Sequence, residues 1–274
     1  MRLLKPLALG LAITAYCLPS VLPAQTAKEQ REAQVWSLQG LDTGYCVLFV
    51  IDPRAASKQL KRGFRPVPAG QDGMLHPALR QVIQHQPEFG SWSASRLCFY
   101  FSDAVQVGSR RVAEKNPRNQ QMLAVWTLAA EDEESRVRRD LAVELFAGRG
   151  NLRRAGESAG VRLREAHASV IDSAGSATDV YSMKLERTTV VWRGRSTGDS
   201  TRVDHAMEES WSVPGTRLGL WSVHFAFRPL SSRALAGSLT VEGKGDLAKA
   251  MKGSPIRFVG PLYRGGTAEL RFSR

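Results

Sequence analysis

The side chains best suited to proton chemistry lie among aromatic residues in one predicted hairpin. Two apolar runs, 203–213 and 218–227, flank Pro214-Gly215, and the odd-numbered positions form the more apolar face of each run. Both faces lie on one side of a sheet only if odd residues pair with odd residues, which requires a loop with an odd number of residues. Four of these positions are candidates for a binding site: His205, Glu209, Trp211 and Trp221.

Burial among aromatic rings would shift the pKa values of His205 and Glu209 and give a ligand polar anchors inside a curved sheet. The alternative is that both side chains lie at the rim of the sheet, where arginine side chains satisfy them. Four residues along a strand span about 13 Å, so His205 and Glu209 do not touch each other directly.

A second pattern with catalytic associations is Gly156-Glu157-Ser158-Ala159-Gly160, which fits the G-x-S-x-G sequence of serine esterases. In those enzymes the serine lies on a turn that follows a strand and precedes a helix. Here the preceding residues 151–155 are polar and helix-like, and a strand-like run follows. The order is reversed, so the glycines indicate the end of a helix, and we assign no catalytic residue.

The sequence predicts no metal site and no cofactor. The five histidines, at positions 76, 85, 167, 205 and 224, include no pair with a zinc-binding spacing. The chain also lacks a P-loop, a G-x-G-x-x-G fingerprint and an EF-hand loop.

The first 24 residues are typical of a secretory signal peptide. Arg2 and Lys5 precede an uncharged run from Pro6 to Pro23, and Ala24 provides a small residue at the exit. A membrane anchor is disfavoured because prolines interrupt the run, and Cys17 lacks the surroundings of a lipidation site. We therefore expect cleavage after Ala24 and a periplasmic or extracellular protein with no transmembrane segment in the mature chain.

Removal of residues 1–24 leaves two cysteines, Cys46 and Cys98. An even count in an oxidising compartment favours a disulfide, and both residues lie in strand-like runs that could neighbour each other. Two buried thiols are the alternative.

The chain is strongly basic, with 38 Lys and Arg against 26 Asp and Glu over 274 residues. Loss of Arg2 and Lys5 with the leader changes the formal net charge from +12 to +10. The basic residues are spread along the chain and include no nucleic-acid-binding motif, so we expect no nucleic-acid partner. Long-range attraction favours an anionic envelope component, a lipid or a glycan, as the partner.

Local patterns predict a β-rich chain with a few short helices. Apolar runs indicate strands at 43–51, 96–107 and 121–128, and alternation indicates another at 181–186. Helical signals lie near Pro77, near Asn151 and after Asp246, which we expect to be the N-cap of its helix. The run 141–146 fits a strand or a helix equally well.

We therefore predict an α+β fold that is mostly antiparallel β-sheet with two or three short helices in two lobes. The expected segments are a signal peptide at 1–24, an N-terminal lobe at 25–132 and a β-rich lobe at 133–274, divided near the acidic stretch Glu131–Glu134. The sequence favours an exported, non-catalytic binding or envelope-associated protein over an enzyme. The alternatives are a secreted hydrolase with a dispersed active site, using His205 or His224, and a structural subunit of an envelope assembly.

Overall fold

A computed structural model describes residues 34–273 of the chain apart from 74, 115–120, 149, 159, 172–178, 204–206 and 215–219. The predicted signal peptide and His205 lie outside the described residues. Residues Glu32–Arg274 form one compact unit. The expected lobe boundary after Asp132 lies at the turn between two strands that pair with each other, β5 and β6.

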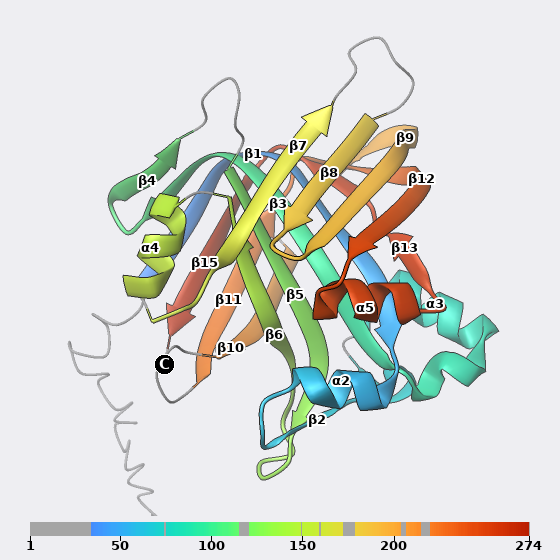
Figure 1. Ribbon diagram of the computed structural model, residues 1–274. Helices are drawn as coiled ribbons and strands as arrows, with labels where there is room; N and C mark the ends of the chain where they lie inside the picture. Colours follow the sequence, from blue (N-terminus) through green and yellow to red (C-terminus); the bar gives the residue numbers. More distant parts are fainter. Residues whose placement is uncertain are drawn as a thin grey trace, which may run out of the picture. The chain divides into compact units, whose positions relative to one another are not determined.

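The described residues contain one 15-stranded sheet that closes on itself twice (Figure 1). Four strands form a wall common to both closures: β1 (Gln34–Ile51), β3 (Ser93–Val107), β5 (Gln121–Asp132) and β6 (Arg138–Ala147). We call the two closed arrangements the nine-strand ring and the seven-strand ring.

The nine-strand ring leaves the wall at β6 and returns to it at β1. Its other strands are β7 (Arg164–Ile171), β8 (Asp179–Leu185), β9 (Thr188–Arg202), β12 (Ser231–Gly243) and β14 (Leu262–Arg264). The seven-strand ring also joins β6 to β1, through β10 (Met207–Pro214), β11 (Leu220–Arg228) and β15 (Thr267–Ser273). Short strands β2 (Phe64–Pro66), β4 (Arg110–Glu114) and β13 (Arg257–Val259) pair at the edges.

Each ring encloses its own hydrophobic core, and the wall separates the two. Val47, Leu97 and Trp126 face the nine-strand core, whereas Cys98 and Val125 face the seven-strand core. Strands that are buried on both faces have continuous apolar sequences, which explains why the wall strands are apolar along most of their length. Strand β8 borders one core only, so Tyr181 and Met183 are buried while Lys184 is exposed.

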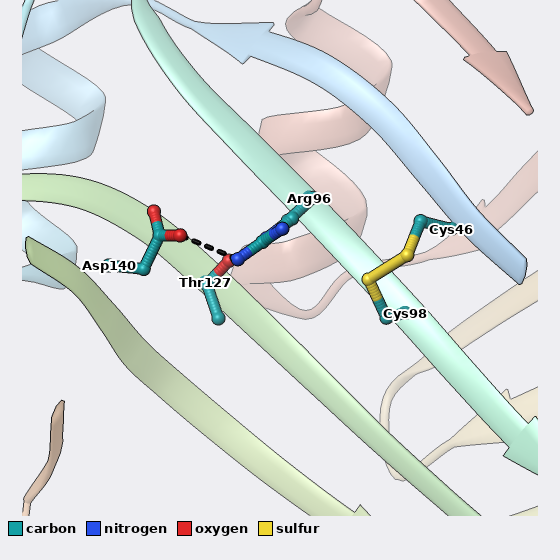
Figure 2. Close-up of a disulfide and its surroundings, with 5 residues drawn as sticks. All are labelled: Cys46, Arg96, Cys98, Thr127 and Asp140. Carbon is teal, nitrogen blue, oxygen red and sulfur yellow. Dashed lines mark hydrogen bonds and ion pairs between the residues drawn. A yellow bond between two sulfur atoms is a disulfide. The ribbon is translucent and has the colours of Figure 1, made fainter. Parts of the chain in front are cut away.

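The predicted disulfide between Cys46 and Cys98 is present and joins β1 to β3 within the wall (Figure 2). The two residues are direct cross-strand partners in the antiparallel register. Side chains of such partners lie on the same face, and this places both sulfur atoms on the seven-strand side.

Four α-helices occur in the described part of the chain, more than the two or three predicted. They are α2 (Pro53–Gln59), α3 (Pro77–His85), α4 (Gly150–Ser158) and α5 (Asp246–Gly253), with 3-10 turns η1 (Ala69–Gln71) and η2 (Pro87–Ser91). Helix α2 was missed because it is short. Asp52 caps it by accepting hydrogen bonds from the backbone N–H groups of Arg54 and Ala55. Gly245, not Asp246, is the N-cap of α5.

Helices α2 and α5 lie together at one end of the nine-strand ring (Figure 1). Ala56 of α2 and Leu247 and Met251 of α5 are buried in the nine-strand core. Their packing covers the end of that core and leaves the polar faces of both helices outside. No helix in the described ranges is long and apolar enough to cross a membrane.

Candidate functional site

Strand β6 loses its partner on one side at the point where the two rings diverge. It pairs in parallel with β10 through Asp140 and Leu141, and with β7 through Phe146 and Ala147. Among the described pairings, positions 142–145 therefore have a strand partner only on the β5 side. A register shift opposite Trp126 and Thr127 adds a local irregularity at Val143, of the kind often found beside functional sites.

A cavity of about 470 Å³ opens at this fork, and we call it the β6 cleft. Its lining comes from β6, from the segment before β7, from the residues that follow α2 and from the end of β10. The lining residues are Gln59, Lys61, Leu141, Ala142, Val143, Glu144, Leu145, Arg162, Arg164 and Val213. The volume lies in the range of small-molecule sites, and the mixture of apolar walls with a few charged groups is typical of them.

Glu144 is the acidic residue of this lining, and its side chain is 20% exposed. Burial raises the pKa of the Glu144 carboxyl above 4.5, and the nearby Glu186 carboxylate acts in the same direction. Arg164 opposes the rise, because its Nε lies 3.0 Å from Glu144 Oε1. The net result is a carboxyl group that holds its proton at higher pH than an ordinary glutamate does.

Arg164 bridges two carboxylates. Its guanidinium contacts Glu144 through Nε and Glu186 through Nη1, and these acidic neighbours raise the pKa of Arg164 although burial opposes them. Glu186 lies in the turn between β8 and β9. The bridge therefore fixes the position of Glu144 relative to β7 and to that turn.

Two further cations line the cleft, Lys61 and Arg162. Both are exposed, and neither forms an ion pair with another described residue. Cations without carboxylate partners at a cavity are available to an anionic ligand, whereas Arg164 is occupied. The β6 cleft thus combines a proton donor or acceptor of raised pKa with unpaired positive charge.

A second polar cluster lies where α3 meets the wall, and Figure 2 shows part of it. Arg96 donates from Nη2 to Asp140 Oδ2 at 2.5 Å and from Nε to Thr127 Oγ1 at 3.3 Å. His76 lies beside them, and burial, followed by the charge of Arg96, lowers its pKa. The cavity here measures about 30 Å³, which suits a water molecule and excludes a substrate.

A third cluster, on β2, β5 and β6, surrounds Glu131. Hydrogen bonds from Arg65 and Arg138, together with Arg136, lower the pKa of Glu131 to about 2. Its carboxylate is 7% exposed and accepts hydrogen bonds from all three guanidinium groups. These contacts tie the β5–β6 turn to β2.

The hairpin predicted around Pro214-Gly215 is confirmed, with odd residues paired to odd residues from Met207–Phe227 to Val213–Trp221. Its loop is longer than expected, since Pro214 pairs with Leu220. Trp211 is buried in the seven-strand core and stacks on Phe225 at 5.2 Å between ring centroids. The side chains of Glu209 and Trp221 lie outside the description, as does all of His205, so their binding role stays a prediction.

The residues of the β6 cleft were missed by the sequence analysis. The available signal was Glu144 itself, a lone carboxylate inside the apolar run Leu141–Phe146. Its cationic neighbours come from two separate segments, and the pairing of β6 with β7 brings Arg162 and Arg164 to it while Lys61 follows α2. The G-x-S-x-G serine, by contrast, lies at the end of α4 and donates to the carbonyl of Ala155, as the reversed order indicated.

No group of three or more His, Cys, Asp or Glu side chains suited to a metal ion occurs among the residues described. In the β6 cleft, one acidic side chain, Glu144, faces an arginine.

Comparisons with known proteins find similarity at the level of fold. No protein family and no curated sequence matches the chain. Acetoacetate decarboxylase from Legionella pneumophila subsp. pneumophila str. Philadelphia 1 aligns with a TM-score of 0.50 and 8% identity, over 87% of this chain and 84% of that one. An acetoacetate decarboxylase-like enzyme from Sphingomonas wittichii RW1 aligns with a TM-score of 0.47 and 10% identity, over 88% of this chain and 90% of that one.

The enduracididine biosynthesis enzyme MppR, in complex with pyruvate, aligns with a TM-score of 0.44 and 12% identity, over 88% of this chain and 87% of that one. The chain therefore has an acetoacetate decarboxylase-like fold: mixed, mainly antiparallel sheet with four helices in the described residues.

These comparisons correct the functional expectation from the sequence. The Legionella structure that shares this fold is an enzyme, which contradicts the prediction of a non-catalytic binding protein and the preference against an enzyme. The sequence analysis went wrong because it judged catalysis by short motifs. A site assembled from single residues on several strands leaves no such motif.

Proposed function

We propose that the chain is an enzyme of the lyase type that acts on a small β-keto acid in the β6 cleft. The observation that carries the proposal is the raised pKa of Glu144 in a cavity of about 470 Å³ that also holds Lys61 and Arg162. The fold shared with the Legionella acetoacetate decarboxylase supports the choice of substrate class.

In the proposed reaction Glu144 is the general acid. It gives its proton to the keto oxygen while the bond between the carboxylate carbon and its neighbour breaks, which releases CO2 and leaves an enol. The enol becomes the ketone, and Glu144 regains a proton from solvent. A carboxyl suits this role when its pKa approaches the working pH, and the burial of Glu144 acts in that direction.

The cations have a separate role. Lys61 and Arg162 attract the anionic substrate and offset the negative charge that builds on the keto oxygen. Arg164 is a positioning residue, because its contacts are with Glu144 and Glu186.

The test incubates the purified chain with acetoacetate and measures acetone and CO2 above the uncatalysed rate. We expect Glu144→Gln to lower kcat by about 10²- to 10⁴-fold, the usual contribution of general acid–base catalysis, with acetoacetate affinity changed little. Arg162→Ala should mainly raise KM. Glu242→Gln is the matched control, because Glu242 is exposed on β12 and outside the cleft.

Turnover that is unchanged in Glu144→Gln contradicts the role of Glu144. Absence of both turnover and binding with acetoacetate contradicts the substrate class. Glu144→Asp keeps the carboxyl group, so its activity should exceed that of Glu144→Gln if the proton matters and not the shape of the side chain.

A further inference from the structure

A second cavity adjoins the β6 cleft across the end of α2. It measures about 390 Å³ and lies between α2 and α5, and we call it the α2–α5 cleft. The residues that line it are Ile51, Asp52, Arg54, Ala55, Lys58, Gln59, Asp246, Lys249, Ala250 and Gly253. Gln59 lines both clefts, so they adjoin at this residue.

The α2–α5 cleft carries positive charge that the protein leaves unpaired. Arg54 and Lys58 are four residues apart on α2, which places them on one face about one turn, or ~5 Å, apart. Neither forms an ion pair with another described residue. The acidic groups nearby are engaged, since Asp52 accepts two backbone N–H groups and Asp246 contacts Lys249 at 3.5 Å.

Gln59 is thus common to the linings of two cationic clefts. Lys61 and Arg162 are in the β6 cleft, and Arg54 and Lys58 are in the α2–α5 cleft. An amide between them can donate to or accept from the uncharged middle of a ligand. A substrate with a single carboxylate would use one of these sites only.

We propose that the natural substrate is a dicarboxylic keto acid whose reacting end lies in the β6 cleft and whose second carboxylate reaches Arg54 and Lys58. This inference rests on the proposed function, because it places the reacting end beside Glu144. It adds Arg54, Lys58 and Gln59 as residues that determine substrate specificity, although none of them takes part in proton transfer.

The test compares the binding of butyrate and glutarate by isothermal titration calorimetry at fixed ionic strength. Glutarate is butyrate with a second carboxylate at the far end, and neither compound is consumed. We expect glutarate to bind about three- to tenfold more tightly, the gain of one charge-assisted contact in a partly enclosed site. The double variant Arg54→Gln/Lys58→Gln should lose this preference and keep the affinity for butyrate.

Lys184→Gln/Arg193→Gln is the matched control, because it also removes two positive charges, on β8 and β9, outside both clefts. It should keep the preference for glutarate. Equal loss of preference in the control and in the double variant overturns the proposal, since attraction by overall charge would then explain the result.

The outcomes separate this inference from the proposed function. Butyrate binding without any gain for glutarate overturns the dicarboxylate proposal and leaves the β6 cleft as a monocarboxylate site. Failure of both compounds to bind overturns the dicarboxylate proposal, while turnover of acetoacetate still decides the proposed function. A preference for glutarate that persists in Arg54→Gln/Lys58→Gln overturns the assignment of those two residues.

Discussion

Two opposing effects act on the pKa of the Glu144 carboxyl. Burial on β6 raises the pKa of its carboxyl, and the guanidinium of Arg164 at 3.0 Å lowers it. Burial is the larger of the two, so the pair differs from the Glu131 network, where three arginines lower the carboxyl pKa to about 2. The same residue type therefore has a raised carboxyl pKa at one site and a lowered one at the other.

The environment of His76 predicts how the free energy of unfolding depends on pH. Its Nδ1 accepts from the backbone N–H of Ala78 and caps α3, while burial and the charge of Arg96 lower its pKa below 6.5. The unfolded chain then binds more protons than the folded chain just below pH 6.5. The free energy of unfolding therefore rises with pH through that range and becomes constant above it.

His76→Asn keeps a capping side chain and removes the titration. We expect the wild-type protein to lose stability relative to this variant as the pH falls from about 8 to about 5. Urea unfolding of both proteins across that range measures the difference. A difference that does not change with pH would show that folding does not lower the pKa of His76.

At the scale of the elements, the β9–β12 pair depends on the close approach of two glycines. Gly194 and Gly237 are direct cross-strand partners. A Cβ on Gly194 would lie 2.3 Å from the carbonyl oxygen of Ala236 and 2.5 Å from Cζ2 of Trp192. Backbone on one side and a buried indole on the other leave no room for it.

Gly194→Ala should therefore destabilise the protein by about 1–3 kcal/mol, the usual cost of overpacking. Thermal unfolding monitored by Trp fluorescence would detect the loss. Gly73→Ala is the control, since a Cβ there meets nothing within 4 Å and the backbone is not in the left-handed region. Equal stability of the two variants would mean that β9 and β12 move apart at little cost.

The strands themselves were largely predictable. The apolar runs that became β1, β3 and β5, the alternation that became β8, and the helix at Pro77 are local patterns, and the structure contains each of them. Residues 141–146 were ambiguous because a short apolar run fits either period, and pairing with β5 decides for a strand.

The closure of the sheet was not predictable in the same way. It depends on pairing between residues far apart in the chain, such as Trp36 with Leu270 and Trp211 with Asp140. No local period encodes such contacts, and the parallel pairing of β6 with β7 and β10 leaves no turn signal between the partners. The β6 cleft exists because of those pairings, so the position of the site was hidden together with the topology.

For the whole molecule, the shared wall couples the two cores. Strands β1, β3, β5 and β6 each present one face to the nine-strand core and the other to the seven-strand core. Opening either ring therefore exposes apolar side chains of a wall that the other ring also needs. The disulfide between Cys46 and Cys98 closes a loop between two strands of that wall, with a sequence separation of 52.

The final prediction concerns the double variant Cys46→Ala/Cys98→Ala. In the chain-entropy account, a loop of this size stabilises the fold by about 4 kcal/mol, so the variant should unfold at a clearly lower guanidinium concentration. Trp126 and Trp192 report on the nine-strand core, and Trp36 and Trp211 report on the seven-strand core.

Single Trp→Phe replacements in the variant distinguish these signals. We expect the transitions of the two cores to coincide, because neither core is complete without the wall. Reduced wild-type protein should shift by the same amount as the variant, which separates loss of the bond from loss of the sulfur atoms. If the tryptophans of one core reported an earlier transition, the two rings would be separate folding units, and the wall would belong to only one of them.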